Sequence, residues 1–201
     1  MARVSADVRR ELLIEAAIRV MSRDGVARTT TRAIVAEADM RLGAFHYCFR
    51  SKAELLEQVI RAITTHTLEP ALAAFEREGT LEELLLGGLK EYWDHVIKFP
   101  EEHRVTYELT QYAGREPGLD EVARKQYEIY LEANTTILDT LADRAGITWS
   151  EPVPVLARYL AATIDGLTLL YLNEGDADIA WKALELGVRH LLSAAVTEPS
   201  A

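Results

Sequence analysis

The sequence predicts an all-α protein of about nine helices, with an N-terminal three-helix unit of helix-turn-helix type and a larger helical domain after it. Three observations lead to this prediction. Apolar residues recur every three to four positions along most of the chain, no segment alternates apolar and polar residues as a strand does, and Gly and Pro separate the periodic segments. A chain of 201 residues can bury two small cores of this kind.

Start and stop signals place the individual helices. Ser5 or Asp7 can cap the first helix and Gly25 can end it, while Ser51-Lys52-Ala53-Glu54 is a capping box that opens the fourth. Residues 197–201 are expected to form a frayed tail. The predicted helices cover residues 8–23, 30–38, 42–49, 51 to 66 or beyond, 81–99, 101–113, 120–145, 152–173 and 179–196.

Charge and composition narrow the function classes. The chain carries a net charge of −10, which argues against nucleic acid, but residues 1–52 have a net charge of +4 and residues 53–201 one of −14. We therefore predict a domain boundary there, with the fourth helix linking domains 1–52 and 53–201.

The single Cys48 excludes an internal disulfide and a Cys-based zinc site. We find no signal peptide and no apolar run near membrane length, and expect a cytoplasmic protein without a membrane partner.

The second short helix, over residues 42–49, has the features of a recognition helix for a DNA major groove. Phe45 and Phe49 lie four positions apart and are expected to face the core. Small and polar residues fall on the opposite side, where they can approach the groove or donate to phosphates: Gly43, Ala44, His46 and Tyr47. Arg41 and Lys52 flank this helix and can reach phosphates. Three short amphipathic helices also occur in proteins that bind no DNA.

A more specific pattern runs from Gly25 to Leu55. It combines a Thr pair before the second helix, an Ile-x-x-x-Ala face, a Gly-small-aromatic run and a Lys at the start of the fourth helix: Thr29, Thr30, Ile34, Ala38, Gly43, Ala44, Phe45, Phe49 and Lys52. With the first helix it spans about 45 residues. This segment resembles the DNA-binding domain of the TetR family of bacterial repressors.

The resemblance implies roles for single residues. Thr30 would cap the second helix and bind a phosphate, Gly43 and Ala44 would approach bases, and Tyr47 and Lys52 would bind phosphates. The predicted DNA-binding set is Arg28, Thr30, Arg32, Arg41, Leu42, Gly43, Ala44, His46, Tyr47 and Lys52. Asp39 stands where the family usually has a turn Gly, and Asp tolerates the left-handed conformation. Leu42 replaces a frequent Lys or Arg, so it would contact an apolar group such as a thymine methyl, and the operator sequence stays open.

The resemblance also implies a C-terminal domain that dimerises and binds a small molecule. The predicted dimer face is an apolar stripe on the last two helices, comprising Leu156, Leu160, Trp181, Leu184, Val188 and Leu191. The same stripe is also explained by packing within one chain. The predicted ligand-binding residues are Trp93, Tyr107, Tyr127, Tyr130, Asn134, Thr163 and Tyr171, although aromatic residues at helical spacing are more often plain core.

Catalytic and metal-binding patterns are weak. The acidic and histidine residues over 91–103 lack the repeated Glu-x-x-His of a di-metal bundle, and no Gly-rich phosphate loop follows a strand. We therefore expect no enzyme activity, no metal and no cofactor other than a small-molecule effector. The favoured hypothesis is a homodimeric repressor that binds a palindromic double-stranded DNA operator and is released by that effector. The alternative is a helical small-molecule-binding protein without specific DNA binding.

Overall fold

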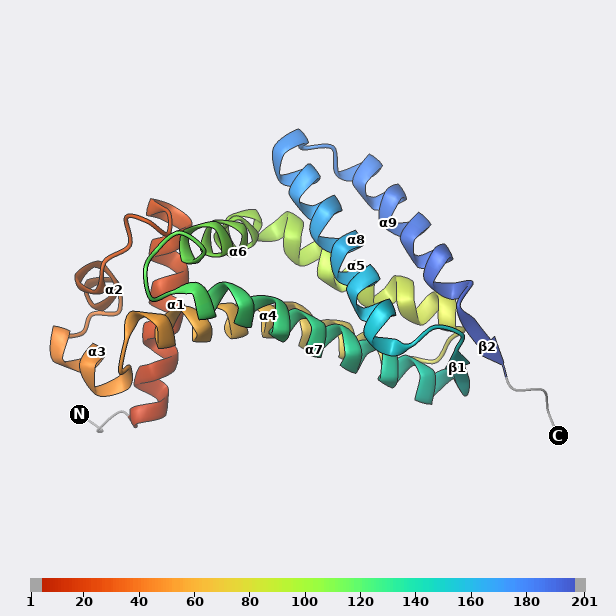
Figure 1. Cartoon of the computed structure of the whole chain (residues 1–201), viewed down its shortest axis with the longest axis horizontal. Helices are drawn as coiled ribbons and strands as arrows, with labels where there is room; N and C mark the ends of the chain where they lie inside the picture. Colours follow the sequence, from red (N-terminus) through yellow and green to blue (C-terminus); the bar gives the residue numbers. More distant parts are fainter. Residues whose placement is uncertain (1–4, 198–201) are drawn as a thin grey trace. The chain divides into compact units, whose positions relative to one another are not determined.

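The computed structural model of the protein describes residues 5–197 (Figure 1). Nine helices lie in this part of the chain, and most ends fall within a few residues of those predicted, so the all-α fold is confirmed. The helices are α1 (Ala6–Asp24), α2 (Thr31–Glu37), α3 (Leu42–Cys48), α4 (Lys52–Phe75), α5 (Leu81–Lys98), α6 (Pro100–Ala113), α7 (Asp120–Ala145), α8 (Val153–Glu174) and α9 (Ala177–Leu192).

The chain forms two compact units. The N-terminal unit comprises Met1–Ile63 and Glu101–Tyr127, and the C-terminal unit comprises Thr64–Pro100 and Glu128–Ala201. The N-terminal unit therefore contains the helix-turn-helix, the first part of α4, nearly all of α6 and the start of α7. The predicted boundary at residue 52 lies where the net charge changes sign, whereas the two units are defined by which residues pack together.

Helix α1 is the centre of the N-terminal unit. Its buried face is almost entirely apolar, with Leu13, Ala16, Ala17, Val20 and Met21 at most 1% exposed. The Ser5 hydroxyl accepts a bond from the Val8 N–H at 3.2 Å, which caps the helix as predicted. Gly25 ends it with a positive φ of 83°. The two short helices α2 and α3 pack against α1, and each buries an apolar side chain, Ile34 and Phe45.

The turn between α2 and α3 depends on Asp39. This residue has a φ of 52°, and it is the one non-glycine residue with a positive φ in the described part of the chain. The Met40 N–H then bonds the Val35 carbonyl at 2.7 Å and closes the turn. The expectation that Asp39 can replace the turn glycine is confirmed.

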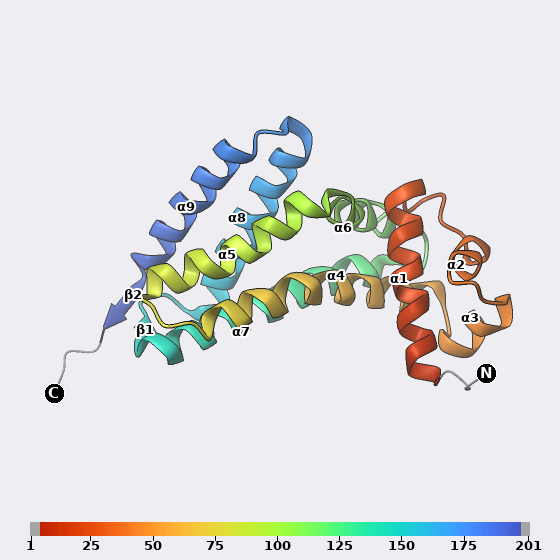
Figure 2. The same ribbon diagram turned by 180° about the vertical axis from the view of Figure 1, so that it is seen from behind.

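The core of the C-terminal unit lies between α4, α5 and the last three helices. Phe75, Leu138 and Leu141 are at most 2% exposed and pack with Leu156 and Leu191. A Cβ at Gly88 would lie 2.4 Å from the Phe75 ring, so only glycine permits this contact between α4 and α5. Figures 1 and 2 show α8 and α9 side by side as an antiparallel pair.

Two short strands were not predicted. β1 (Ile147–Trp149) pairs antiparallel with β2 (Ala195–Thr197), and Trp149 Nε1 donates to the Leu138 carbonyl at 3.2 Å. Helix α9 therefore ends at Leu192, and Thr197 belongs to a strand rather than a tail. Three residues are too few to show an alternating pattern, and the pairing joins segments far apart in sequence. The rest of the predicted tail lies outside the described residues.

Helix α8 is apolar over most of its length, and few of its residues are buried. Among the helices of the described residues, it alone is long and apolar enough to cross a membrane. The expectation that no apolar segment reaches this length is therefore wrong by length and composition. One such helix is weak evidence for a membrane span. Its exposed large apolar residues share one side of the helix: Val155, Tyr159, Leu169 and Leu170.

The structure corrects the predicted dimer stripe. Leu156, Leu184, Val188 and Leu191 are at most 7% exposed, because they form the protein's own core and offer almost no surface to another chain. Leu160 and Trp181 are half-buried, and Trp181 Nε1 donates to Glu185 at 2.8 Å. The exposed apolar residues of α9 are instead Ile179 and Leu186. The amphipathic spacing predicts the helices α8 and α9 correctly. The predicted dimer face, however, is the side of these helices that packs into the protein's own core.

The strained turn gives a test of the fold. Asp39→Val should lower the free energy of unfolding by about 1–2 kcal/mol, because a β-branched side chain is disfavoured at positive φ. Asp39→Gly should stay within about 1 kcal/mol of the wild type. Urea unfolding followed by circular dichroism measures both, and equal midpoints for the Val variant and the wild type would contradict this account of the turn.

Candidate nucleic-acid interface

Helix α3 presents the predicted recognition surface to solvent. Phe45 and Phe49 are at most 3% exposed and anchor the helix to the core, as expected. Tyr47 is 68% exposed and Leu42 is 40% exposed. The Gly43 backbone is fully open, since a Cβ built there would meet no atom within 4 Å. Arg41 occupies the N-cap position, Arg41 and His46 are exposed, and Ala44 is half-buried.

The start of α2 supplies the second group of predicted contacts. Thr30 is the N-cap residue, and its hydroxyl accepts a bond from the Ala33 N–H at 3.1 Å. Arg28 and Arg32 are both exposed on either side of it. The Arg28 Nε donates to the Asp24 carbonyl, so the Arg28 side chain lies against the end of α1. The capping role predicted for Thr30 is confirmed, and its phosphate contact stays a prediction.

Arg10 has a structural role rather than one at the surface. Its guanidinium donates to the Cys48 carbonyl, forms an ion pair with Glu54 at 2.8 Å and lies over the Phe49 ring at 4.5 Å. The sequence-based charge count included Arg10 among the positive residues of the N-terminal domain. Because its charge is paired with Glu54, it contributes little net charge to DNA binding.

The capping box at α4 differs in detail from the predicted one. The Ser51 hydroxyl accepts from the Glu54 N–H at 3.1 Å, as expected. The Glu54 carboxylate, however, accepts from the Arg50 N–H at 2.9 Å, one residue before the N-cap. This backbone bond, and then the Arg10 guanidinium, lower the pKa of Glu54 below its usual value. The ionised carboxylate thus fixes the link between α3 and α4.

Sequence reasoning missed the partner of Tyr47. The Arg9 guanidinium lies 5.2 Å from the centroid of the Tyr47 ring, within the range of a cation–π contact. Arg9 is on the second turn of α1 and is half-buried. Its place in the basic N-terminal segment was visible in the sequence, but its pairing with an aromatic ring on α3 depends on the fold.

Lys52 also has a partner that the sequence did not indicate. Its Nζ donates to the Tyr112 hydroxyl at 2.9 Å and lies 4.6 Å from the centroid of that ring. Tyr112 is on α6, and 60 residues separate the two side chains. No local pattern could reveal this contact, which places α6 against the start of α4.

The predicted ligand-binding residues do not form one group. Tyr107 and Tyr127 belong to the N-terminal unit, and the other five belong to the C-terminal unit. The structure brings Trp93 and Tyr171 together, with ring centroids 4.8 Å apart. Asn134 is buried and donates to the Ala157 carbonyl at 3.3 Å, and Tyr130 is half-buried. Thr163 faces α9, where a Cβ at Gly187 would lie 2.9 Å from its methyl group.

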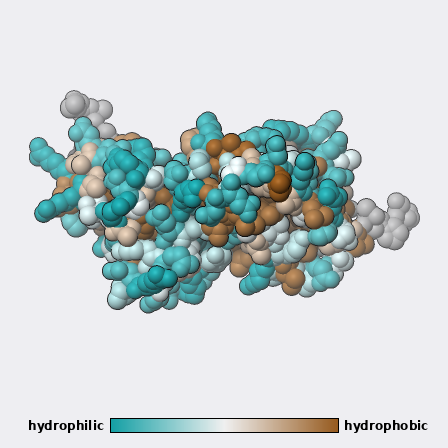
Figure 3. All heavy atoms as spheres, turned by 90° about the horizontal axis from the view of Figure 1, so that it is seen from above, coloured by the Kyte–Doolittle hydropathy of each residue, from teal (hydrophilic) through white to brown (hydrophobic). Residues whose placement is uncertain are grey.

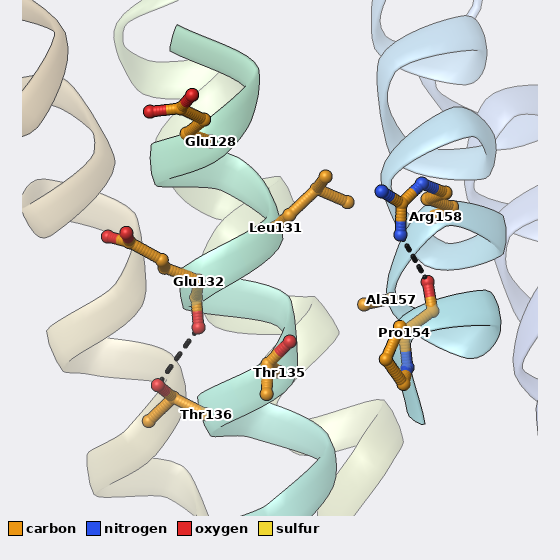
Figure 4. A pocket seen from close by; sticks show the side chains of 8 residues that line it. All are labelled: Glu128, Leu131, Glu132, Thr135, Thr136, Pro154, Ala157 and Arg158. Carbon is orange, nitrogen blue, oxygen red and sulfur yellow. Dashed lines mark hydrogen bonds between the residues drawn. The ribbon is translucent and has the colours of Figure 1, made fainter. Parts of the chain in front are cut away.

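A groove of about 480 Å³ lies between α7 and α8 (Figure 4). In the close view Leu131 and Thr135 point toward α8, across from Ala157 and Pro154, and Glu132 points away. The Arg158 guanidinium bonds the Pro154 carbonyl at 2.9 Å at its edge. None of the seven predicted ligand-binding residues lines this groove. Glu128 also lines the groove.

Comparison with known proteins identifies the family. The family model described as bacterial regulatory proteins, tetR family, matches residues 13–59, which hold the helix-turn-helix. A second, described as tetracyclin repressor-like, C-terminal domain, matches residues 79–198. The chain belongs to the TetR family. It is therefore a helix-turn-helix transcriptional regulator, and the family's members with this architecture are regulators rather than enzymes.

Individual relatives can be aligned with this chain over most of their length. The chain is 27% identical to the HTH-type nicotine-responsive transcriptional repressor HdnoR of Paenarthrobacter nicotinovorans, across 84% of this chain and 86% of that protein. Among solved structures, a TetR-family regulator from Rhodococcus sp. matches with a TM-score of 0.79 at 17% identity, covering 92% and 98% of the two chains. Bacillus subtilis FadR, solved in complex with stearoyl-CoA, has a TM-score of 0.68 at 19% identity, covering 89% and 97%.

The open backbone at Gly43 gives a test in which stability and DNA affinity change in opposite directions. Gly43→Ala should raise the free energy of unfolding by up to about 1 kcal/mol, because Ala is the better helix former and the site has room for a methyl group. The same methyl group should lower DNA affinity by about tenfold if the Gly43 backbone approaches the bases. Urea unfolding and fluorescence anisotropy measure the two effects, and unchanged affinity would contradict this docking.

Proposed function

We propose that this TetR-family regulator is a homodimeric repressor that binds a palindromic operator and is released by a small molecule. It would act in the cytoplasm and would need no metal or other cofactor. One observation supports DNA binding most directly: the open Gly43 backbone on α3 is flanked by the exposed Arg41 and Tyr47. Backbone that can approach bases thus lies beside donors for phosphates, which is how helix-turn-helix proteins read a major groove.

The exposed face of α8 and α9 supports a dimer. Val155, Leu170 and Ile179 are each more than half exposed, and such apolar surface usually has a partner. Figure 3, which looks onto these helices from above in Figure 1, shows apolar side chains gathered among polar ones on this surface. Gly166 is open to solvent on α8, so a second helix can pack closely there. A two-fold dimer would place two recognition helices about 34–36 Å apart, which matches one turn of DNA.

Release by a small molecule is supported by two relatives. HdnoR is named as nicotine-responsive, and FadR was solved with stearoyl-CoA. Both are regulators, and nicotine and stearoyl-CoA differ widely in size, so we propose an effector without naming its class. It would bind in the C-terminal unit near Trp93 and Tyr171. To weaken repression it must bind the DNA-incompetent state more tightly than the competent one.

The operator is tested with the DNA just upstream of the protein's own gene. Footprinting should reveal a two-fold-symmetric protected site, because an isologous dimer imposes its symmetry on the DNA. If the protein bound no genomic fragment even at low salt, the repressor proposal would be wrong. The result would then favour a helical small-molecule-binding protein without specific DNA binding.

Dimerisation is tested by light scattering. The wild type should give about twice its chain mass of 22.5 kDa, and Leu170→Glu should give a monomer, because a buried, unpaired carboxylate costs several kcal/mol at an interface. Ile97→Glu is the matched control, since Ile97 is an exposed apolar residue on α5, outside the proposed face. A monomeric wild type would contradict the dimer, and a monomeric Ile97→Glu variant would show that the effect is not specific to α8.

A further inference from the structure

Helix α6 makes two polar contacts with the elements that carry the DNA-binding residues. The Glu108 carboxylate accepts a bond from the Val26 N–H at 2.9 Å, in the segment between α1 and α2. The Tyr112 hydroxyl accepts a bond from Lys52 Nζ at 2.9 Å, at the start of α4. Glu108 and Tyr112 are four residues apart and therefore share one face of α6. All four residues lie in the N-terminal unit.

The Lys52–Tyr112 contact differs from the ion pairs around it. Arg10 and Arg23 bond carboxylates, which neutralise their charge. Within the described residues, the polar partner of the Lys52 ammonium is the uncharged phenol, which it meets at the hydroxyl and over the ring. An ammonium group has three N–H donors, so two remain available. The side chain is thus fixed in direction while its charge stays available to an anion.

Lys52 is also the first residue of α4, where the helix dipole favours a negative group. A lysine side chain has four rotatable bonds, and a phosphate contact normally requires all of them to be ordered on binding. Tyr112 orders this side chain before DNA arrives. A bond between the ammonium and a phosphate is stronger than one to a neutral phenol, so DNA can share or replace the contact.

We propose that Tyr112 is a positioning residue for DNA binding: it holds the Lys52 ammonium in place for a backbone phosphate. This inference rests on the proposed DNA-binding function. It makes the phosphate contact at α4 depend on α6, because Tyr112 moves with that helix. Glu108, one turn earlier, fixes the same face of α6 to the segment after α1.

The test is a double-mutant cycle on DNA of arbitrary sequence, because phosphate contacts are independent of base sequence. The dissociation constant for a duplex of about 30 base pairs is measured by anisotropy from roughly 50 to 200 mM salt. Four proteins are compared: the wild type, Tyr112→Phe, Lys52→Met and the double variant. Tyr112→Phe keeps the ring and removes the hydroxyl, and Lys52→Met keeps the apolar stem and removes the charge.

Tyr112→Phe should weaken binding about three- to tenfold, the equivalent of one hydrogen bond. Lys52→Met should weaken it at least as much and lower the salt slope by about 1. In the Lys52→Met background, Tyr112→Phe should have no further effect, because the two residues act through one contact. Tyr92→Phe is the matched control: it also removes a bonded hydroxyl, 2.7 Å from Thr168, but in the C-terminal unit, and it should leave the salt slope unchanged.

Three results would overturn the inference. Tyr112→Phe could leave affinity unchanged, it could tighten binding, which would mean that Tyr112 withholds Lys52 from DNA, or it could weaken binding equally without Lys52. Thermal unfolding of each variant separates these results from loss of structure. A wild type that binds no DNA at low salt would overturn the proposed function itself, which distinguishes the two failures.

Discussion

The ion pair and stacking of Arg10 form the contact on which the DNA-binding unit depends. One guanidinium joins three elements: the helix α1 that carries it, the last carbonyl of α3 and the first turn of α4. It also covers Phe49, the residue through which the recognition helix ends in the core. The exposed residues of α3 are therefore fixed relative to α1 and α4 by buried and half-buried groups. The positive charge of Arg10 thus stabilises the fold of this unit and is not available to DNA, which reduces the number of positive residues that can bind it.

The contacts of α6 extend this arrangement beyond the helix-turn-helix itself. Packing places α6 with the N-terminal helices, although charge and sequence pattern assign it to the other domain. Glu108 and Tyr112 bond the segment after α1 and the start of α4, so a change in α6 reaches both ends of the recognition unit through two short bonds. Under the proposed release by a small molecule, an effector that altered α6 would also alter how Lys52 is presented.

Local signals in the sequence were sufficient for most of the fold. Caps at Ser5 and Thr30, the left-handed Asp39 and the buried Phe45 follow from residue chemistry over three or four positions. Contacts across many positions were not accessible in this way, since the Lys52–Tyr112 bond and the β1–β2 pair join residues that no periodic pattern connects. The dimer stripe was misplaced for another reason. Helices α8 and α9 are apolar on two sides, and periodicity does not say which side the protein's own core uses.

The open space around Gly43 has a consequence for how such regulators diverge. The position is on the surface of α3, has no neighbour within 4 Å, and sits apart from the Phe45 and Phe49 side chains that anchor the helix. A substitution there changes the surface shown to DNA while leaving the core intact. The surface that α3 exposes and the side chains that anchor it to the core thus belong to different residues of the same short helix. Under the proposed DNA-binding role, a single substitution on this face would alter the choice of target site without compensating changes in the core.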